Sequence, residues 1–303
     1  MSVEAAARLP VRRRMRANYQ TVRQVLARIN RYPVIPAAIM TVMVVAAVFA
    51  PYVAPKDPLL GSLRDREIPP MWLEGGRSEF ILGTDPIGRD ILSRIVYGAQ
   101  ISLVIVITVT AVGGTVGTAL GIIAGWYGGN ADEIIMRLVD FTLAVPFILV
   151  ALVTVIVFGQ SFAIVVTLMA VFSWNGFARQ VRAEALGIKT TDYVAVAKVA
   201  GASGYRIMVR HILPGVINTV LVVASLRVGS LILTEAILSF LGAGIPKPTP
   251  AWGVMVADGR DYLGTSWWIA FFPGLAIFLL VLASNFLGDW LRDRLDPRLR
   301  QLA

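Results

Sequence analysis

Six apolar runs, each close to the length that crosses the ~30 Å hydrocarbon core of a bilayer, constrain this chain most strongly. Backbone groups in lipid must be hydrogen-bonded internally, so such runs form either helices or a closed barrel. The runs are continuously apolar and lack the alternation of barrel strands. We therefore expect an all-α, polytopic membrane protein with six transmembrane helices, at about residues 34–50, 101–126, 134–158, 161–178, 215–241 and 267–287.

Composition supports this class and excludes several chemistries. Hydrophobic residues make up 56% of the 303 residues and charged residues only 16%, well outside the range of soluble domains. The chain has no cysteine and one histidine, His211, so disulfides, thiolate metal sites and His-rich metal sites are excluded. We expect no catalytic, cofactor-binding or metal-binding residue on this chain.

The net charge of +9 is concentrated beside the first and last apolar runs. Eight arginines lie in residues 8–31 and four more in residues 292–300. Basic flanks mark the cytoplasmic side of a membrane, and an even number of spans places both termini there. We expect a cytoplasmic arm at 1–33, either an interfacial amphipathic helix or a solvated tail, a membrane domain at 34–291 and a cytoplasmic tail at 292–303. The polar segment 51–88 and the connection 242–266 are then external, with Trp267 and Trp268 in an interfacial belt.

The second apolar run carries glycines four residues apart: Gly113, Gly117, Gly121, Gly125 and Gly129. On a helix they form a strip on one face that lets a neighbouring backbone approach closely. We expect this strip to pack against another helix, either within the subunit or in a partner.

Three residues inside the apolar runs are candidates for a pathway or an interface. Pro146 is expected to kink the helix of the third run. Helices beside a pathway are often kinked, although purely structural kinks are common. Arg227 and Glu235 are costly in a membrane, where ionisable side chains face protein or water. They lie eight residues apart, on one helix face but too distant to bond each other. Asp140, near Arg137, is expected to form an interfacial pair.

A polar, basic stretch from Asp192 to Pro214 separates two of the apolar runs. A simple connection could be much shorter, so we interpret it as a docking surface. It resembles the EAA loop of bacterial ABC importer permeases, a helix–turn–helix in which a glycine marks the bend and a proline the end. Gly201 and Pro214 occupy these positions, whereas Ala195 stands where the family has its glutamate, which puts an ATPase contact through that carboxylate in doubt.

Further motifs resemble one branch of these permeases, the second permease of dipeptide, oligopeptide and nickel importers. They cover roughly residues 34–300 in the family's order. The stretches are Leu82–Gly98 (LGTDPIGRDILSRIVYG), Gly121–Gly129 (GIIAGWYGG) with Asp132, Arg137, Asp140 and Pro146, Leu238–Gly244 (LSFLGAG) with Trp252 and Gly253, and Asn285–Arg298.

The resemblance implies a type I ABC importer permease fold in a bacterial inner membrane. It implies as partners a similar second permease, two ATPase subunits or one fused ATPase that hold ATP and Mg²⁺, and an extracytoplasmic solute-binding protein. The sequence itself has no GxxxxGK[ST] phosphate loop. Arg206 and Arg210 could pair with ATPase carboxylates or with lipid phosphate. The expected coupling segment is 179–214, with Ala195, Ala197, Gly201, Ala202, Ser203, Arg206, Arg210, His211 and Pro214.

Three other classes stay open at this stage. An ion-coupled secondary transporter would show internal repeats and buried carboxylates, an intramembrane enzyme would need a nucleophile–base set or a metal pair, and a scaffold would need no pathway. Peptides head the list of substrates, while nickel, glutathione-like molecules and sugars remain possible cargo.

Overall fold

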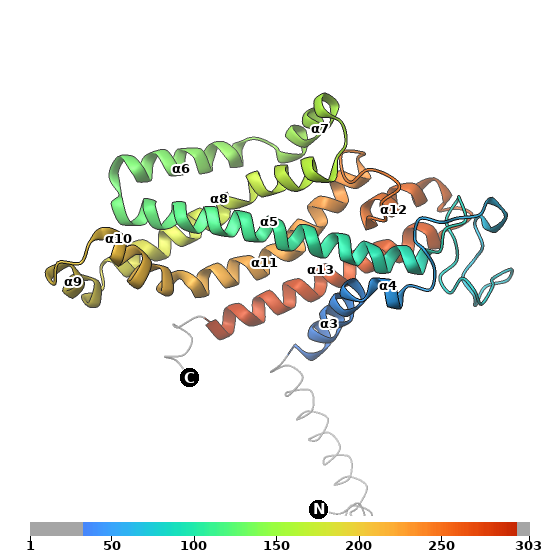
Figure 1. The fold of residues 1–303 in the computed structure, drawn as a ribbon, viewed down its shortest axis with the longest axis horizontal. Helices are drawn as coiled ribbons and strands as arrows, with labels where there is room; N and C mark the ends of the chain where they lie inside the picture. Colours follow the sequence, from blue (N-terminus) through green and yellow to red (C-terminus); the bar gives the residue numbers. More distant parts are fainter. Residues whose placement is uncertain (1–32, 296–303) are drawn as a thin grey trace, which may run out of the picture.

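The computed structural model describes residues 33–295, which form helices joined by short turns and two longer irregular segments (Figure 1). The expectations for residues 1–32 and 296–303 concern parts outside this range. The α-helices are α3 (Val34–Val48), α4 (Ala50–Val53), α5 (Ile91–Tyr127), α6 (Gly129–Ala144), α7 (Phe147–Phe158), α8 (Phe162–Lys189), α9 (Asp192–Val199), α10 (Gly204–Ile207), α11 (Leu213–Phe240), α12 (Trp252–Gly259) and α13 (Trp268–Leu295).

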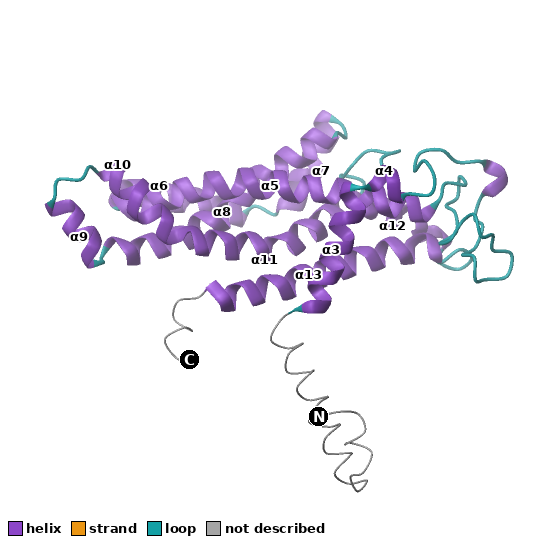
Figure 2. Cartoon of the chain, turned by 60° about the horizontal axis from the view of Figure 1, so that its bottom comes forward, coloured by secondary structure: helices purple, strands orange, loops and turns teal. Residues whose placement is uncertain are grey.

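The long helices α5, α8, α11 and α13 run lengthwise through the molecule, and both views show α9 at one end and α12 at the opposite end (Figures 1 and 2). The longest, α5, has 37 residues, which is roughly 55 Å at about 1.5 Å per residue. Asp90 caps its start through a bond from the Ser93 backbone N–H, and Gly128, with a φ of 68°, ends it. The connection 242–266, expected outside, and the Asp192–Pro214 stretch, expected inside, therefore lie at opposite ends of one bundle.

Four of the described helices are long and apolar enough to cross a membrane: α5, α8, α13 and the continuous helix Gly204–Phe240. The pair α6 and α7 makes a fifth if it is counted as one span, although it is bent by 76°. The run at 34–50 gives the 15-residue helix α3, because Pro51 has no N–H to donate and the helix breaks at Phe49. The structure thus provides four to five of the six full-length spans expected from the sequence.

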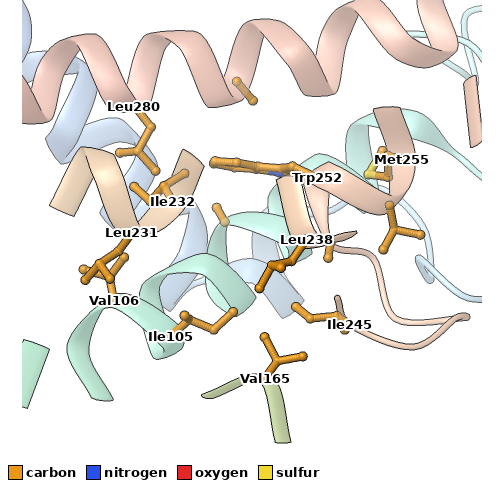
Figure 3. Packing of buried hydrophobic residues seen from close by; sticks show 14 of the residues in the cluster. Ile105, Val106, Val165, Leu231, Ile232, Leu238, Ile245, Trp252, Met255 and Leu280 are labelled. Carbon is orange, nitrogen blue, oxygen red and sulfur yellow. The ribbon is translucent and has the colours of Figure 1, made fainter. Parts of the chain in front are cut away.

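The larger hydrophobic core gathers side chains of α5, α8, α11, α12 and α13, and Figure 3 shows part of it around Trp252. Its central side chain is Trp252, which is fully buried among residues of α5, α11 and α13. The indole Nε1 donates to the carbonyl of Ile95 at 2.9 Å, so the ring's polar atom is satisfied where water is absent. The connection 242–266, which is expected to be external, therefore contributes α12 to the core.

Trp268 also departs from its expected place. Its side chain is buried, and its Nε1 donates to the carbonyl of Thr84 at 3.3 Å. Of these two tryptophans, Trp267 is the one that remains available for an interfacial belt, with 38% of its surface exposed. The expectation for Trp268 was wrong because the segment 54–90 folds back over the start of α13, which hydropathy alone does not reveal.

A buried polar network holds that segment in place. The Asp85 carboxylate accepts from the backbone N–H groups of Ile87 and Arg89 and pairs with the Arg89 Nε at 2.6 Å. Arg94, almost fully buried, lies 3.8 Å from Asp85 and donates to the carbonyl of Pro58 at 3.2 Å. The LGTDPIGRDILSR motif is therefore the polar core of this end of the molecule.

We predict that Trp252→Ala destabilises the chain by about 3–5 kcal/mol, because it leaves a large cavity in the core. Thermal unfolding of the detergent-solubilised protein measures the effect. The matched control is Tyr52→Ala, which removes an aromatic ring that is 88% exposed. Equal melting temperatures for the two variants would show that Trp252 does not anchor α12.

Candidate functional site

The segment from α9 to α10 forms one end of the bundle. Helix α9 ends in a Schellman arrangement, in which the Ala202 N–H bonds the Ala197 carbonyl and the Gly201 N–H bonds the Lys198 carbonyl, both at 3.0 Å. This arrangement requires Gly201 in the left-handed region, where its φ is 81°. Ser203 then caps α10 by accepting from the Arg206 N–H. The expected bend at Gly201 is therefore present.

Pro214, in contrast, does not end a helix. The chain stays helical from Gly204 to Phe240, with a π-helical turn at Met208–Ile212 directly before the proline. A π turn inserts an extra residue, and this accommodates a residue that cannot donate a backbone hydrogen bond. The second short helix and the fifth apolar run are consequently one continuous element.

Trp126, at the end of α5, anchors the α9–α10 segment. The Lys198 Nζ of α9 lies 4.9 Å from the centre of its ring, and the Nζ of Lys189, the last residue of α8, donates to its carbonyl at 2.6 Å. A Cβ on Gly204 would lie 2.9 Å from the indole Nε1. A small core beside these contacts joins Val194 of α9, Ile207 of α10 and Ile212 of the π turn to side chains of α5, α8 and α11. The segment is thus held against the ends of three long helices.

The outer side of this segment is apolar and basic. Val199 is 91% and Tyr205 73% exposed. Arg206 and Arg210 are also exposed and form no ion pair with another described residue. Of the remaining expected site residues, Ala195, Gly201, Ser203 and Pro214 are exposed, Ala197 and Ala202 pack against the small core, and His211 is half-buried with its ring 6.1 Å from that of Tyr193.

The glycine strip of α5 lies directly against α8. A Cβ on Gly113 would lie 1.8 Å from the Ser173 Oγ, and one on Gly117 would lie 2.4 Å from the Trp174 carbonyl oxygen. A Cβ on Gly121 would likewise lie 2.7 Å from the Ala178 carbonyl oxygen, and one on Gly125 would lie 2.8 Å from the Ala185 Cβ. Gly129 does not belong to the strip, because α5 has ended and Gly129 starts α6 with a φ of 52°. We name the four-glycine contact the α5–α8 seam.

A polar cavity of about 390 Å³ lies halfway along the bundle, between α8, α11 and the break between α6 and α7. Arg227 projects to it from the middle of α11, and Pro146 borders it at the start of α7. The Arg227 guanidinium donates from Nη1 to the Ser173 carbonyl at 2.7 Å and from Nη2 to the Asn175 Oδ1 at 3.3 Å. The structure thus brings Pro146 and Arg227 together.

Glu235 lies apart from this cavity. It is 2% exposed, and its Oε1 accepts from the Ser239 Oγ at 2.6 Å near α12. The Ser239 Oγ in turn accepts from the Ile245 N–H at 3.3 Å. Within residues 33–295, no three His, Cys, Asp or Glu side chains are grouped so that they could hold a metal ion.

The ion pairs on α6 differ from those expected. Asp140 pairs with Arg179 of α8, while Arg137 pairs with Glu133 one turn earlier. Asp132 forms a bidentate ion pair with Arg182 of α8, and the sequence analysis did not predict this pair. The partners are 39 and 50 residues apart, so only the folded chain reveals them. These pairs attach α6 to α8 and hence to the α5–α8 seam.

Comparison with known proteins adds a separate line of information. Residues 117–301 match the family described as binding-protein-dependent transport system inner membrane component. The di/tripeptide transport system permease protein DppC of Pseudomonas aeruginosa is 43% identical over 265 residues, 87% of each chain. The glutathione transport system permease protein GsiD of Pectobacterium atrosepticum is 47% identical over 227 residues, 75% of each chain.

Two further matches extend this picture. The dipeptide transport system permease protein DppC of Escherichia coli K12 is 42% identical, covering 90% of this chain and 91% of that protein. Among solved structures, the inward-facing MetNI methionine ABC transporter superposes with a TM-score of 0.55 at 18% identity, covering 67% of this chain and 96% of the other. At that identity the structural match shows a similar fold only.

We predict that Gly117→Ala destabilises the protein by about 1–3 kcal/mol, because the added methyl group overlaps the α8 backbone. Gly187→Ala is the matched control on α8, where a Cβ meets nothing within 4 Å. The control should be neutral or stabilising by up to about 1 kcal/mol, since alanine favours helix. Melting temperatures of the purified variants measure both effects, and a Gly117→Ala variant as stable as wild type would contradict the close seam.

Proposed function

Because this chain belongs to the family of binding-protein-dependent transport system inner membrane components, we propose that it carries di- or oligopeptides across a bacterial inner membrane. It is a multi-pass permease subunit of an ATP-binding-cassette importer, not an enzyme. The peptide cargo is supported by the relatives, which include di/tripeptide, dipeptide and glutathione permeases at 42–47% identity.

We infer that the chain works with a second permease, ATPase subunits that bind ATP and Mg²⁺, and an extracytoplasmic solute-binding protein. The observation that carries this inference is the α9–α10 segment together with the π turn that follows it. They expose Val199, Tyr205, Arg206 and Arg210 at one end of the bundle. An exposed patch of apolar and basic side chains fits a protein surface with hydrophobic pockets and carboxylates. We therefore propose that the segment docks on the ATPases and that this end of the bundle faces the cytoplasm.

The proposed coupling segment does not use the family's glutamate. Ala195 is exposed on α9 and carries no charge, so the contact relies on shape, the apolar side chains and the two arginines. We expect the affinity for the ATPases to fall with rising salt, because exposed charge pairs are screened.

The internal contacts give a route from the coupling segment to the polar cavity. Trp126 of α5 contacts Lys198 of α9 and Gly204 of α10. The α5–α8 seam holds α5 to α8, and Ser173 of α8 holds Arg227 of α11. When the ATPases close on ATP, they displace α9 and α10, and the three helices move together. The cavity then changes the side from which it is open, provided that ATP and the loaded binding protein favour different states.

The function is tested by purifying the tagged chain from its native membrane in mild detergent and identifying the bound proteins. Recovery of a second permease and ATPases, together with ATP-dependent peptide uptake after reconstitution with the binding protein, is the expected result. Recovery of the chain alone, with uptake driven by a proton gradient, would instead indicate a secondary transporter.

We predict that Gly201→Asp leaves the chain folded and in the membrane but uncouples peptide uptake from ATP hydrolysis. The substitution places a negative side chain in the proposed ATPase contact and strains the left-handed backbone at a φ of 81°. Peptide uptake and ATP hydrolysis are measured in parallel in proteoliposomes.

Gly159→Asp is the matched control for this variant. Gly159 has the same φ of 81° and the same open surroundings, but it lies at the α7–α8 turn. Normal coupling is expected for the control. Normal transport by Gly201→Asp would show that α9 and α10 are not the coupling segment.

A further inference from the structure

Arg227 is a guanidinium placed halfway along a membrane-spanning helix, where a charge is costly and is retained for a function. Within the described residues it forms no ion pair. On the neighbouring α6, Asp140 pairs with Arg179, and on α11 itself Glu235 accepts from Ser239, so neither carboxylate pairs with Arg227. The cavity around Arg227 therefore carries a net positive charge.

The guanidinium is held by neutral groups that leave part of it available. A guanidinium has five N–H donors, of which one bonds the Ser173 carbonyl and another the Asn175 amide oxygen. Its Cζ lies 5.4 Å from the centre of the Phe177 ring. These contacts orient the side chain without neutralising its charge. The remaining polar side chains around the cavity are Thr142, Ser230 and Thr234.

Gly176 creates the space that the guanidinium occupies. A Cβ on Gly176 would lie 1.9 Å from the Arg227 Nη2 and 2.7 Å from its Cζ. Any other residue at this position would displace the charged group from its present place. Gly176 therefore leaves room for the guanidinium directly beside the α8 backbone.

The break between α6 and α7 adds a second positive feature to the same cavity. Val145, Pro146 and Phe147 border it, and Phe147 begins the 12-residue helix α7. The first N–H groups of a helix lack intrahelical acceptors and carry a partial positive charge. In membrane proteins, the N-terminus of a broken helix is a place where anionic groups of a substrate bind.

We propose that Arg227 and the N-terminal end of α7 form a transient binding site for a carboxylate of the peptide cargo during its passage. Asn175 and Gly176 position the guanidinium. The inference rests on the proposed function, because it assigns this cavity to the cargo. The proposal predicts that the transporter prefers peptides with a free carboxylate. This chain sets that preference, which adds to any preference of the binding protein.

The test uses the complete transporter in proteoliposomes with its binding protein at saturating concentrations of each probe. The two probes are Ala-Ala, which has a C-terminal carboxylate, and Ala-Ala-amide, which does not. For Arg227→Gln, we expect uptake of Ala-Ala to fall roughly ten- to hundredfold relative to wild type, because a charge-assisted hydrogen bond is lost. Uptake of the amide should change little, so the ratio of the two rates reports on the site.

Two further variants separate recognition from folding. Arg227→Lys keeps a positive charge and should retain part of the preference for Ala-Ala. Gly176→Ala keeps Arg227 but displaces it, and should lower Ala-Ala uptake selectively. Arg137→Gln, which removes an exposed arginine paired with Glu133, is the control and should leave the ratio unchanged. If the Arg227→Gln complex does not assemble, the Gly176→Ala ratio decides the question.

An equal fall in the uptake of both probes would overturn the inference and identify Arg227 as structural support, or as the partner of an acidic residue in the second permease. Unchanged uptake of Ala-Ala in Arg227→Gln and Gly176→Ala would also overturn it, while leaving the proposed function intact. A wild-type transporter that moves neither probe nor any other peptide would overturn the proposed function itself.

Discussion

The backbone-to-backbone contact between α5 and α8 is the interaction on which the rest of the described structure depends. Helices in a bilayer gain no hydrophobic free energy by leaving lipid for each other, so they associate through close packing and hydrogen bonds. Glycines four residues apart let α5 approach until the missing Cβ atoms would overlap α8. At one end the seam reaches Gly125 and Trp126, which anchors α9 and α10. At the other end it reaches Ser173, whose carbonyl holds Arg227.

The polar groups of the chain are placed where this packed frame can support them. At the α12 end, the network of Asp85, Arg89 and Arg94 is satisfied internally and closes the bundle. In the middle, Arg227 is oriented by neutral partners and remains charged toward a cavity. At the α9 end, Arg206 and Arg210 face outward. A buried polar core, a polar cavity and a basic surface therefore follow one another along the bundle axis.

Local signals in the sequence predicted a large part of this arrangement. Apolar length gave the long helices, the glycine spacing marked the α5 face that meets α8, and Gly201 marked the bend after α9. Pro146 marked the break between α6 and α7, as a residue without an N–H must. These features depend on a few neighbouring residues and can therefore be read without the fold.

Features that depend on distant residues were missed or wrong. Spacing shows that a helix has a packing face but not which helix meets it, so Asp140 was assigned to Arg137 instead of Arg179. Trp268 resembled an interfacial residue because the segment that covers it is 184 residues away. Gly176 was overlooked because its role exists only beside Arg227. Pro214 was expected to end a helix, but a π turn absorbs it.

The central claim is that the α9–α10 segment and the polar cavity move as parts of one unit. The chain has no cysteine, so a single Ser230→Cys in the cavity lining can be labelled with a membrane-impermeant maleimide in the reconstituted transporter. Labelling rates are compared without nucleotide and with the ATPases trapped in the ATP-bound state. The account predicts that trapping changes the rate, and that Gly201→Asp abolishes the change. Equal rates in both states, or an unaltered change in Gly201→Asp, would contradict it.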